Sequence, residues 1–154
     1  DASLDQPVRM AGRTPRWRPL RDALVQRAFE TWIHADDVRR AIGRPSSPPP
    51  PEDVSVMVAF GVRLLPLALK SLGRDRPGQR AALHLAGASP ALWSVALSDD
   101  TGAGVEVVAL RADAVAFCEL MANRRDLASF AYEADGDYGA AADLLAAAAT
   151  LGCE

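Results

Sequence analysis

The stretch Pro45-Ser46-Ser47-Pro48-Pro49-Pro50-Pro51 places five prolines among seven residues. Each proline fixes its own φ angle and lacks a backbone N–H, so neither a helix interior nor a central strand can run through this stretch. A run of this composition favours an extended, polyproline-type conformation without internal hydrogen bonds. We therefore predict a spacer over residues 45–51 that separates an N-terminal part, residues 1–44, from a C-terminal part, residues 52–154.

The N-terminal part is predicted to contain one long helix. Residues 1–16 include Pro7, Gly12 and Pro15 and show no hydrophobic period, which is typical of an irregular lead-in. The helix is expected to begin near Pro19 and to end at Gly43. Its predicted apolar stripe repeats at helical spacing and comprises Leu24, Ala28, Thr31, Ala35, Val38 and Ile42, widened by Val25, Phe29 and Trp32.

The C-terminal part changes its hydrophobic period along the chain. A helix is expected over residues 53–72, kinked at Pro66, and period-two segments then predict strands near residues 82–86, 92–97 and 105–110 in an antiparallel meander. Three further elements complete the predicted order: a helix from Asp113 to about Asn123, a short extended piece at 130–132 and a last helix over 138–151. The predicted fold class is α+β, with a small antiparallel sheet and flanking helices.

Charge and composition exclude several classes of protein. Residues 9–44 hold nine arginines and four acidic residues, but the charges are interleaved and the pI is near 5.4, so we expect a solvated helix face and no nucleic-acid binding. Apolar runs such as 64–69 and 144–149 are far shorter than the roughly 18 residues that span a bilayer, so no membrane partner is expected.

The two cysteines favour a reducing compartment. Cys118 and Cys153 lack CxxC spacing, and the first residues lack the features of a secretory signal. We therefore expect reduced thiols in a cytoplasmic protein, with Cys118 buried and inert. The three tryptophans, Trp17, Trp32 and Trp93, are expected to be core or interface anchors. Phosphate-binding glycine loops and the GxSxG motif of serine hydrolases are absent from the sequence.

Glu30 and His34 form the clearest chemical pair in the sequence. Residues at i and i+4 lie on one face of a helix, so this pair can present two ligands to a divalent metal, and Asp37 could orient the imidazole from behind. A hydrogen-bonded surface pair or a satisfied core histidine explains the same spacing. The sequence offers no obvious third ligand, since the only other histidine, His84, falls in a predicted strand.

The stretch Glu30-x-Trp32-x-His34-x-x-Asp37-x-Arg39-x-Ala41-x-Gly43, followed by the proline-rich break, resembles the last helix of the DinB-like bundle in the mycothiol-dependent maleylpyruvate isomerase family. The resemblance implies that Glu30 and His34 are metal ligands, for zinc or another divalent ion. It also implies a sterol-carrier-like α+β domain over residues 52–154 that follows the bundle. The other bundle helices and the further ligand histidine would lie outside this chain, which would then be the C-terminal portion of such a protein.

The resemblance also implies an active-site arginine. Of the pair Arg124-Arg125, Arg124 is preferred as the catalytic residue that grips a substrate carboxylate, although cations at a helix C-terminus also suit the helix dipole. Gly136-Asp137 matches a Gly-Asp that precedes the last helix of the family. Asp137 is equally well explained as the N-cap of that helix, with Gly136 easing the turn.

Three functions follow as expectations. In the intact family, a metal activates mycothiol, whose thiolate adds to an unsaturated dicarboxylic acid and permits cis-trans rotation; this chain alone is expected to be inactive. Alternatively, residues 117–124 and 147–154 resemble the branch fused to zinc-finger anti-sigma factors, which implies a non-catalytic, ligand-sensing or scaffolding region and a sigma-factor partner. The third is a module that binds an apolar ligand on the concave side of the α+β domain. In each case we expect the N-terminal helix to pack on that domain or to pair with a second copy.

Overall fold

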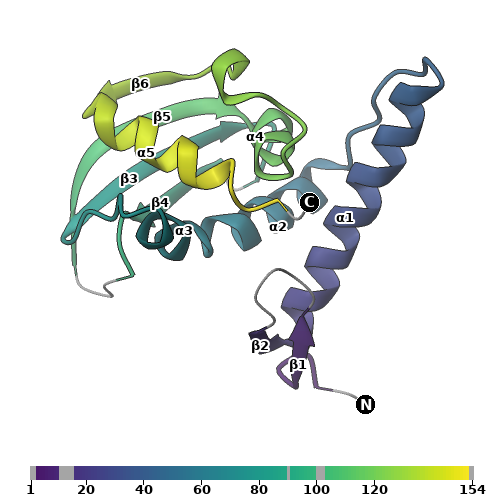
Figure 1. Ribbon diagram of the computed structural model, residues 1–154, viewed down its shortest axis with the longest axis horizontal. Coiled ribbons are helices and arrows are strands. Elements are labelled where there is room, and N and C mark those ends of the chain that lie inside the picture. Colours follow the sequence, from purple (N-terminus) through teal and green to yellow (C-terminus); the bar gives the residue numbers. More distant parts are fainter. Residues whose placement is uncertain (1–2, 11–15, 90, 100–102, 153–154) are drawn as a thin grey trace. The chain divides into compact units, whose positions relative to one another are not determined.

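The computed structural model describes residues 3–10, 16–89, 91–99 and 103–152 (Figure 1). It has the predicted α+β class and divides into two compact units, residues 1–50 and residues 51–152. The division falls between Pro50 and Pro51, at the end of the proline-rich stretch.

The first unit is a β-hairpin followed by a long helix. Strands β1 (Pro7–Met10) and β2 (Arg16–Pro19) pair antiparallel, and helix α1 (Leu20–Ala41) follows directly. The prediction of an irregular lead-in over residues 1–16 is therefore wrong. The hairpin helps to start the helix, because the first helical N–H groups have no partner within the helix. Leu20 N donates to Gln6 O at 2.9 Å and Arg21 N donates to Leu4 O at 3.0 Å.

Helix α1 buries Trp32, which belongs to the widened part of the predicted stripe, but not the six residues that define the stripe. Trp32, Ile33, Asp36 and Asp22 are its buried residues. The six residues of the predicted stripe are all exposed, and the exposed fractions of its largest members are 53% for Leu24, 61% for Val38 and 64% for Ile42. The period predicts the stripe, but period alone cannot say which of two apolar faces of a helix finds a partner. Trp17, predicted as an anchor, is 70% exposed.

The proline-rich segment is tied to α1. Trp32 Nε1 donates to Ser47 O at 3.2 Å, and Ser47 N donates to Asp36 Oδ1 at 3.1 Å. Arg40 Nη2 lies 2.8 Å from Asp36 Oδ2. Residues 45–50 belong to no helix or strand, and Pro51 is the first residue of the next helix, where a missing N–H costs nothing. The segment is thus an anchored strap rather than a free spacer over 45–51.

We predict that the Asp36 anchor weakens in acid. Burial alone would raise the pKa of Asp36, but hydrogen bonds from Ser46 and Ser47 and the charge of Arg40 hold it below its usual value. The pKa of Asp36 is lower in the folded chain than in the unfolded chain. The ionised carboxylate therefore stabilises the attachment of the proline-rich segment above about pH 4, and this stabilisation is lost as the pH falls through the folded pKa. Amide hydrogen exchange at Ser47 should show protection that drops below pH 4, and Asp36→Asn should show low protection at both pH 6 and pH 3. Unchanged protection in Asp36→Asn would contradict this role.

The second unit is built on a mixed four-stranded sheet. Its strands are β3 (Gln79–Ala86), β4 (Leu92–Ala96), β5 (Val105–Asp113) and β6 (Glu133–Gly136), in the order β4-β3-β5-β6. Strands β3 and β5 are parallel, whereas the outer pairs are antiparallel. The predicted antiparallel meander is therefore wrong, since β5 crosses over to the far side of β3. The extended piece predicted at 130–132 instead forms β6 slightly later in the chain.

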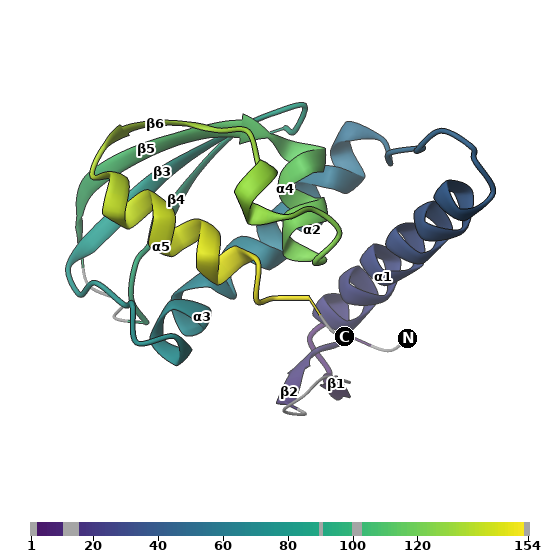
Figure 2. The ribbon, with the colours of Figure 1, turned by 45° about the horizontal axis from the view of Figure 1, so that its top comes forward.

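Helices cover the apolar face of this sheet. These are α2 (Pro51–Val62), α3 (Leu65–Ser71), α4 (Ala114–Met121) and α5 (Tyr138–Ala148), with a short 3-10 helix at Leu127–Ser129. Figure 2 shows α5 running across the sheet, where it contacts β5 and β6. The helix predicted over 53–72 is two helices, interrupted before Pro66. Side chains with essentially no exposed surface fill the space between sheet and helices; among them are Leu83, Leu85, Leu110, Phe117, Leu120 and Leu144.

Two aspartates begin the last two long helices. Asp113 Oδ1 accepts from Ala116 N at 2.8 Å and caps α4, and Asp137 Oδ1 accepts from Ala140 N at 2.9 Å and caps α5. Both helix starts agree with the sequence prediction, as does the expected turn at Gly136, which has φ +103°. A side-chain oxygen of this kind satisfies an N–H group that the helix itself leaves open.

The helical stretch Pro51–Ser71 is the one candidate membrane span in the described part of the chain, with a mean hydropathy of 1.6. Half of this stretch is buried within the structure. The stretch is also broken between α2 and α3, and α2 begins with the acidic residues Glu52 and Asp53. Core helices of soluble proteins have the same length and composition, so we describe α2 and α3 as core elements of the second unit.

Candidate functional site

Helix α1 places the predicted metal-site residues along one side. Glu30, His34 and Asp37 follow one another at spacings of four and three residues, so they lie close together on the helix surface. The His34 side chain is 70% exposed, and its Nδ1 lies 3.6 Å from Asp37 Oδ2. Asp37 is thus in the position predicted for a residue that orients the imidazole, although 3.6 Å is longer than a hydrogen bond. This geometry leaves Nε2 of His34 as the nitrogen that is open to a ligand.

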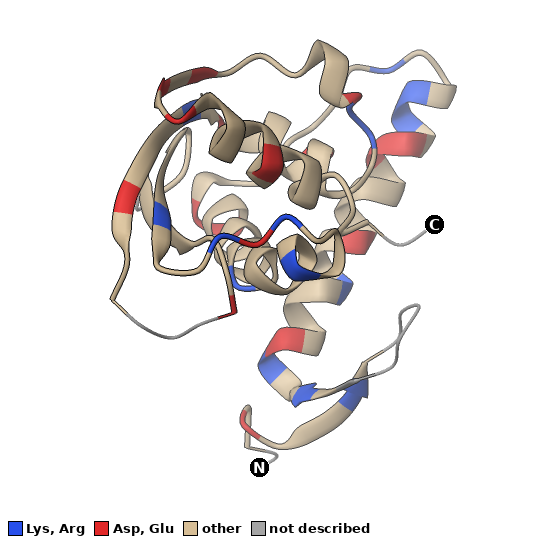
Figure 3. Ribbon diagram, turned by 60° about the vertical axis from the view of Figure 1, so that its left-hand side comes forward, with Lys and Arg blue, Asp and Glu red and all other residues tan. Residues whose placement is uncertain are grey.

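The Glu30 carboxylate is already engaged by its own helix. Gln26 Nε2 donates to Glu30 Oε1 at 2.9 Å, and Arg27 Nη1 donates to Glu30 Oε2 at 3.1 Å. Figure 3 shows how acidic and basic positions alternate along α1. A guanidinium beside the carboxylate supplies the positive charge that a metal ion would otherwise supply.

A small hollow lies beside Glu30. It has a volume of about 100 Å³ and is lined by Arg9 and Met10 of β1 and by Ala23, Gln26, Arg27 and Glu30 of α1. The hairpin therefore contributes to the surroundings of Glu30, which the sequence prediction did not anticipate because it treated residues 1–16 as irregular. The hollow has room for a few waters or one small polar group.

The donor set does not by itself make a complete metal centre. A tight zinc site uses three or four protein ligands, and the described residues contain no group of three or more His, Cys, Asp or Glu side chains placed to hold a metal. Glu30 and His34 fit a divalent ion in chemical type but amount to two donors, one of which is paired with Arg27. His84 lies on β3 in the other unit.

Arg124 lies just after α4, where its Nη1 donates to Ala122 O at 3.1 Å. This bond to a carbonyl at the helix end agrees with the simpler explanation of a cation at a helix C-terminus. Its neighbour Arg125 makes the more substantial contact. Arg125 Nε and Nη2 lie 2.9 and 2.6 Å from Glu119 Oε2, and Glu119 is only 5% exposed.

Sequence reasoning missed the Glu119–Arg125 pair because the two residues are six apart and α4 ends between them. Asn123 has φ +56°, a left-handed conformation that turns the chain back over the helix end. Arg124 N then donates to Glu119 O at 2.8 Å, which closes the turn and brings Arg125 over α4. An Asn at this place after a helix is the one sequence signal of the turn.

Cys118 is buried on α4 next to this pair. Burial, with the nearby carboxylates of Asp113 and Glu119, raises the pKa of the thiol far above its usual value. The thiolate that would act as a nucleophile or metal ligand is therefore disfavoured. The expectation that Cys118 is buried is confirmed, and the raised pKa agrees with the expectation that its thiol is inert.

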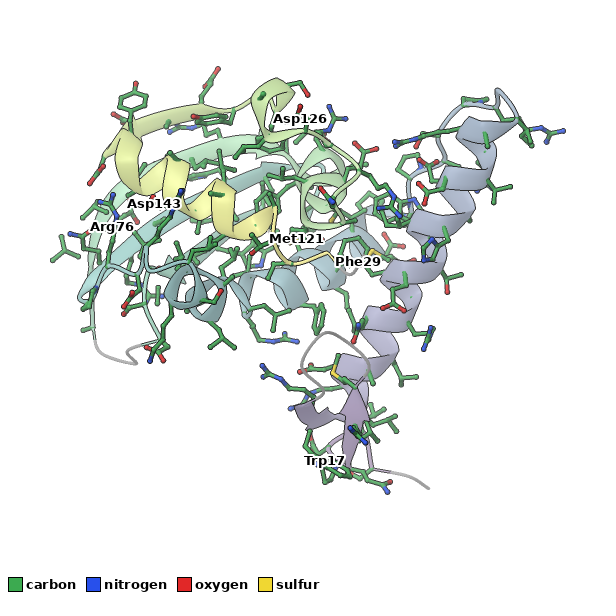
Figure 4. The ribbon with its side chains drawn as sticks, in the orientation of Figure 1. Trp17, Phe29, Arg76, Met121, Asp126 and Asp143 are labelled. Carbon is green, nitrogen blue, oxygen red and sulfur yellow. The ribbon has the colours of Figure 1, made fainter. Side chains whose placement is uncertain are left out.

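A second charge cluster joins the segment before β3 to α5. Arg76 Nε and Nη2 lie 3.0 and 2.8 Å from Asp143 Oδ2, while Arg76 Nη1 lies 2.8 Å from Asp137 Oδ2 (Figure 4). The hydrogen bond from Ala140 N, together with the charge of Arg76, lowers the pKa of Asp137. Because Asp137 also caps α5, the cluster has a structural explanation. Sequence reasoning placed Asp137 but gave no role to Arg76 or Asp143.

Comparison with known proteins gives no relative: no protein family, no curated protein and no solved structure matches this chain.

Proposed function

We propose that this chain is the C-terminal portion of a protein similar to the mycothiol-dependent maleylpyruvate isomerases and that it is inactive by itself. In the proposal, Glu30 and His34 supply two ligands of a divalent metal site that needs further ligands from outside this chain. When bound, the metal would activate a thiol. Arg124 would receive a carboxylate of the substrate, a role for which its exposed position after α4 leaves the guanidinium accessible to solvent.

The observation that carries the proposal is the geometry at His34. The exposed imidazole has Asp37 3.6 Å from Nδ1 and Glu30 one turn earlier on the same helix. At 3.6 Å Asp37 makes no hydrogen bond to Nδ1, but a carboxylate on this side of the ring attracts a proton on Nδ1 and leaves Nε2 as the nitrogen that a metal could bind. A core histidine would be buried, whereas a surface ion pair is the alternative taken up below.

Zinc titration of the full 154-residue chain by calorimetry tests the two-ligand site. We expect weak, saturable binding of one ion, because two donors and the adjacent Arg27 give low affinity. His34→Ala should abolish the binding, and Asp37→Asn should weaken it roughly tenfold. Circular dichroism should show that both variants remain folded, since both side chains lie at the surface of α1.

His84→Ala is the matched control, because it removes the other histidine of the chain and should leave zinc binding unchanged. Arg27→Ala provides a change in the opposite direction: removal of the cation that bonds Glu30 should tighten zinc binding. Zinc binding that is absent, or that persists in His34→Ala, would overturn the metal role of α1.

A second function is favoured by the contacts of Glu30. Gln26 and Arg27 already bond both of its oxygens, as expected of a surface network rather than an open ligand. We propose as the alternative a non-catalytic region that senses a small carboxylate or thiol ligand, or serves as a scaffold, within an anti-sigma factor that binds a sigma factor through other residues. If this alternative holds, the zinc titration should detect no binding to either the native chain or the Arg27→Ala variant. In both proposals the protein acts in the cytoplasm, apart from nucleic acid and membranes.

A further inference from the structure

The exposed stripe of α1 has a regular spacing. Its six residues follow one another at intervals of four, three, four, three and four; they are Leu24, Ala28, Thr31, Ala35, Val38 and Ile42. The 18 residue steps from Leu24 to Ile42 make about five turns of an α-helix, so the stripe stays on one side over about 27 Å. All six side chains are exposed although five of them are apolar. Such an alternating spacing is the seam by which one helix packs lengthwise against another.

The stripe is also symmetric about Ile33, the centre of the six positions. If a second α1 is placed antiparallel with the two Ile33 residues at the same height, each stripe residue faces another stripe residue. Leu24 then faces Ile42, Ala28 faces Val38, and Thr31 faces Ala35. We propose that this face of α1 is an interaction surface for a second copy of the chain, which packs on it antiparallel.

Side-chain size supports the antiparallel direction. In that arrangement the small Ala28 lies opposite the larger Val38, and the two central pairs of Thr31 with Ala35 allow the helix backbones to approach closely. A parallel pair would set Ala28 against Ala28 and Ala35 against Ala35, leaving gaps between wider contacts at the ends. Gaps of this kind forfeit the contacts that stabilise a packed interface.

Charge supports the same direction. Arg27 and Asp37 lie on the same flank of the stripe, near its N-terminal and C-terminal ends, and their side chains are 75% and 35% exposed. An antiparallel partner brings its Asp37 to the end of the helix that carries Arg27, so opposite charges meet on this flank. In a parallel pair this flank of one helix and the same flank of its partner lie on opposite sides of the seam, so Arg27 and Asp37 would not meet.

This surface is tested independently of the function proposed above, although Arg27 and Asp37 on its flank also contact Glu30 and His34. Glu30 and His34 lie beside the stripe and are not members of it. The chain can therefore form the pair without binding zinc, and it can bind zinc without forming the pair. The partner is a second copy because the stripe is complementary to itself in position, size and charge.

Sedimentation velocity of the full chain over a concentration series tests the pairing. We expect a shift from monomer to dimer as concentration rises, and Val38→Glu should remove it by placing a charge against Ala28 of the second copy. Val56→Glu is the matched control, since Val56 is a 50% exposed valine on α2, outside the stripe. A chain that stays monomeric at high concentration, or a dimer that survives in Val38→Glu, overturns the proposal.

Disulfide cross-linking tests the direction. In a Cys153→Ser background, Leu24→Cys and Ile42→Cys chains are mixed and oxidised, with one of them carrying a mass tag. Antiparallel pairing should give mainly the cross-link between the two different chains. Cross-links confined to like chains, Leu24→Cys with itself and Ile42→Cys with itself, would show a parallel pair and overturn the antiparallel arrangement.

Discussion

Gly136→Ala is expected to lower the free energy of unfolding by roughly 3 kcal/mol or more. Gly136 ends β6 with φ +103°, a conformation that side chains other than hydrogen rarely allow. A Cβ at this position would also collide with Val107 O and lie 3.2 Å from Val108 Cα. Both neighbours are backbone atoms of β5, which cannot move aside without disturbing the strand pair. The measurement is urea denaturation followed by far-UV circular dichroism.

Gly73→Ala is the matched control for this prediction. Gly73 also has a positive φ, +64°, but a Cβ there would meet nothing within 4 Å. In this variant the free energy of unfolding should fall only by the conformational penalty of about 1–2 kcal/mol. The difference between the two variants therefore reports the contact with β5 together with the less favourable φ of Gly136. Equal losses in both variants would show that the close approach of Gly136 to β5 has no energetic weight.

Arg125→Ala is expected to destabilise the second unit by about 2–3 kcal/mol, because it removes two short hydrogen bonds from a carboxylate buried on α4. Glu119 is 5% exposed, whereas the Arg125 side chain is 38% exposed. The expected loss of stability is therefore smaller than for a fully buried ion pair, in which both charged groups are removed from water. Arg125→Lys should recover only part of the loss, since lysine keeps the charge but lacks the planar fork that reaches Glu119 with two nitrogens. Urea denaturation again gives the measurement.

Arg124→Ala is the matched control, one residue away in the same turn. Arg124 is exposed, and its loss should change stability by less than about 0.5 kcal/mol. The pair of variants thus compares two roles: Arg125 bonds the buried Glu119, while Arg124, whose Nη1 donates to Ala122 O, is the exposed arginine proposed for the ligand contact. A larger loss of stability in Arg124→Ala than in Arg125→Ala would reverse this assignment.

From the sequence, only the part of the candidate site that lies on a single helix could be predicted. The spacing of Glu30, His34 and Asp37 fixes their common side of α1, and the structure keeps them there. The hairpin strand β1, which adds Arg9 and Met10 to the surroundings of Glu30, could not be predicted, because strands of only four residues give almost no periodic signal. Arg125 was overlooked in favour of Arg124, since the turn at Asn123 decides which arginine reaches Glu119.

Local sequence patterns were enough to predict the long helix α1, the break at the prolines, the aspartates that cap α4 and α5, and the α+β class. Each depends on neighbours within a few residues, through period, capping or the missing N–H of proline. The tertiary structure alone decided which face of α1 is buried and which partner each strand takes. The parallel pair β3–β5 joins segments that β4 separates in the chain, and Trp32 turns inward because Ser47, fifteen residues later, accepts its N–H. Such choices depend on contacts between residues far apart in sequence, which a local pattern does not encode.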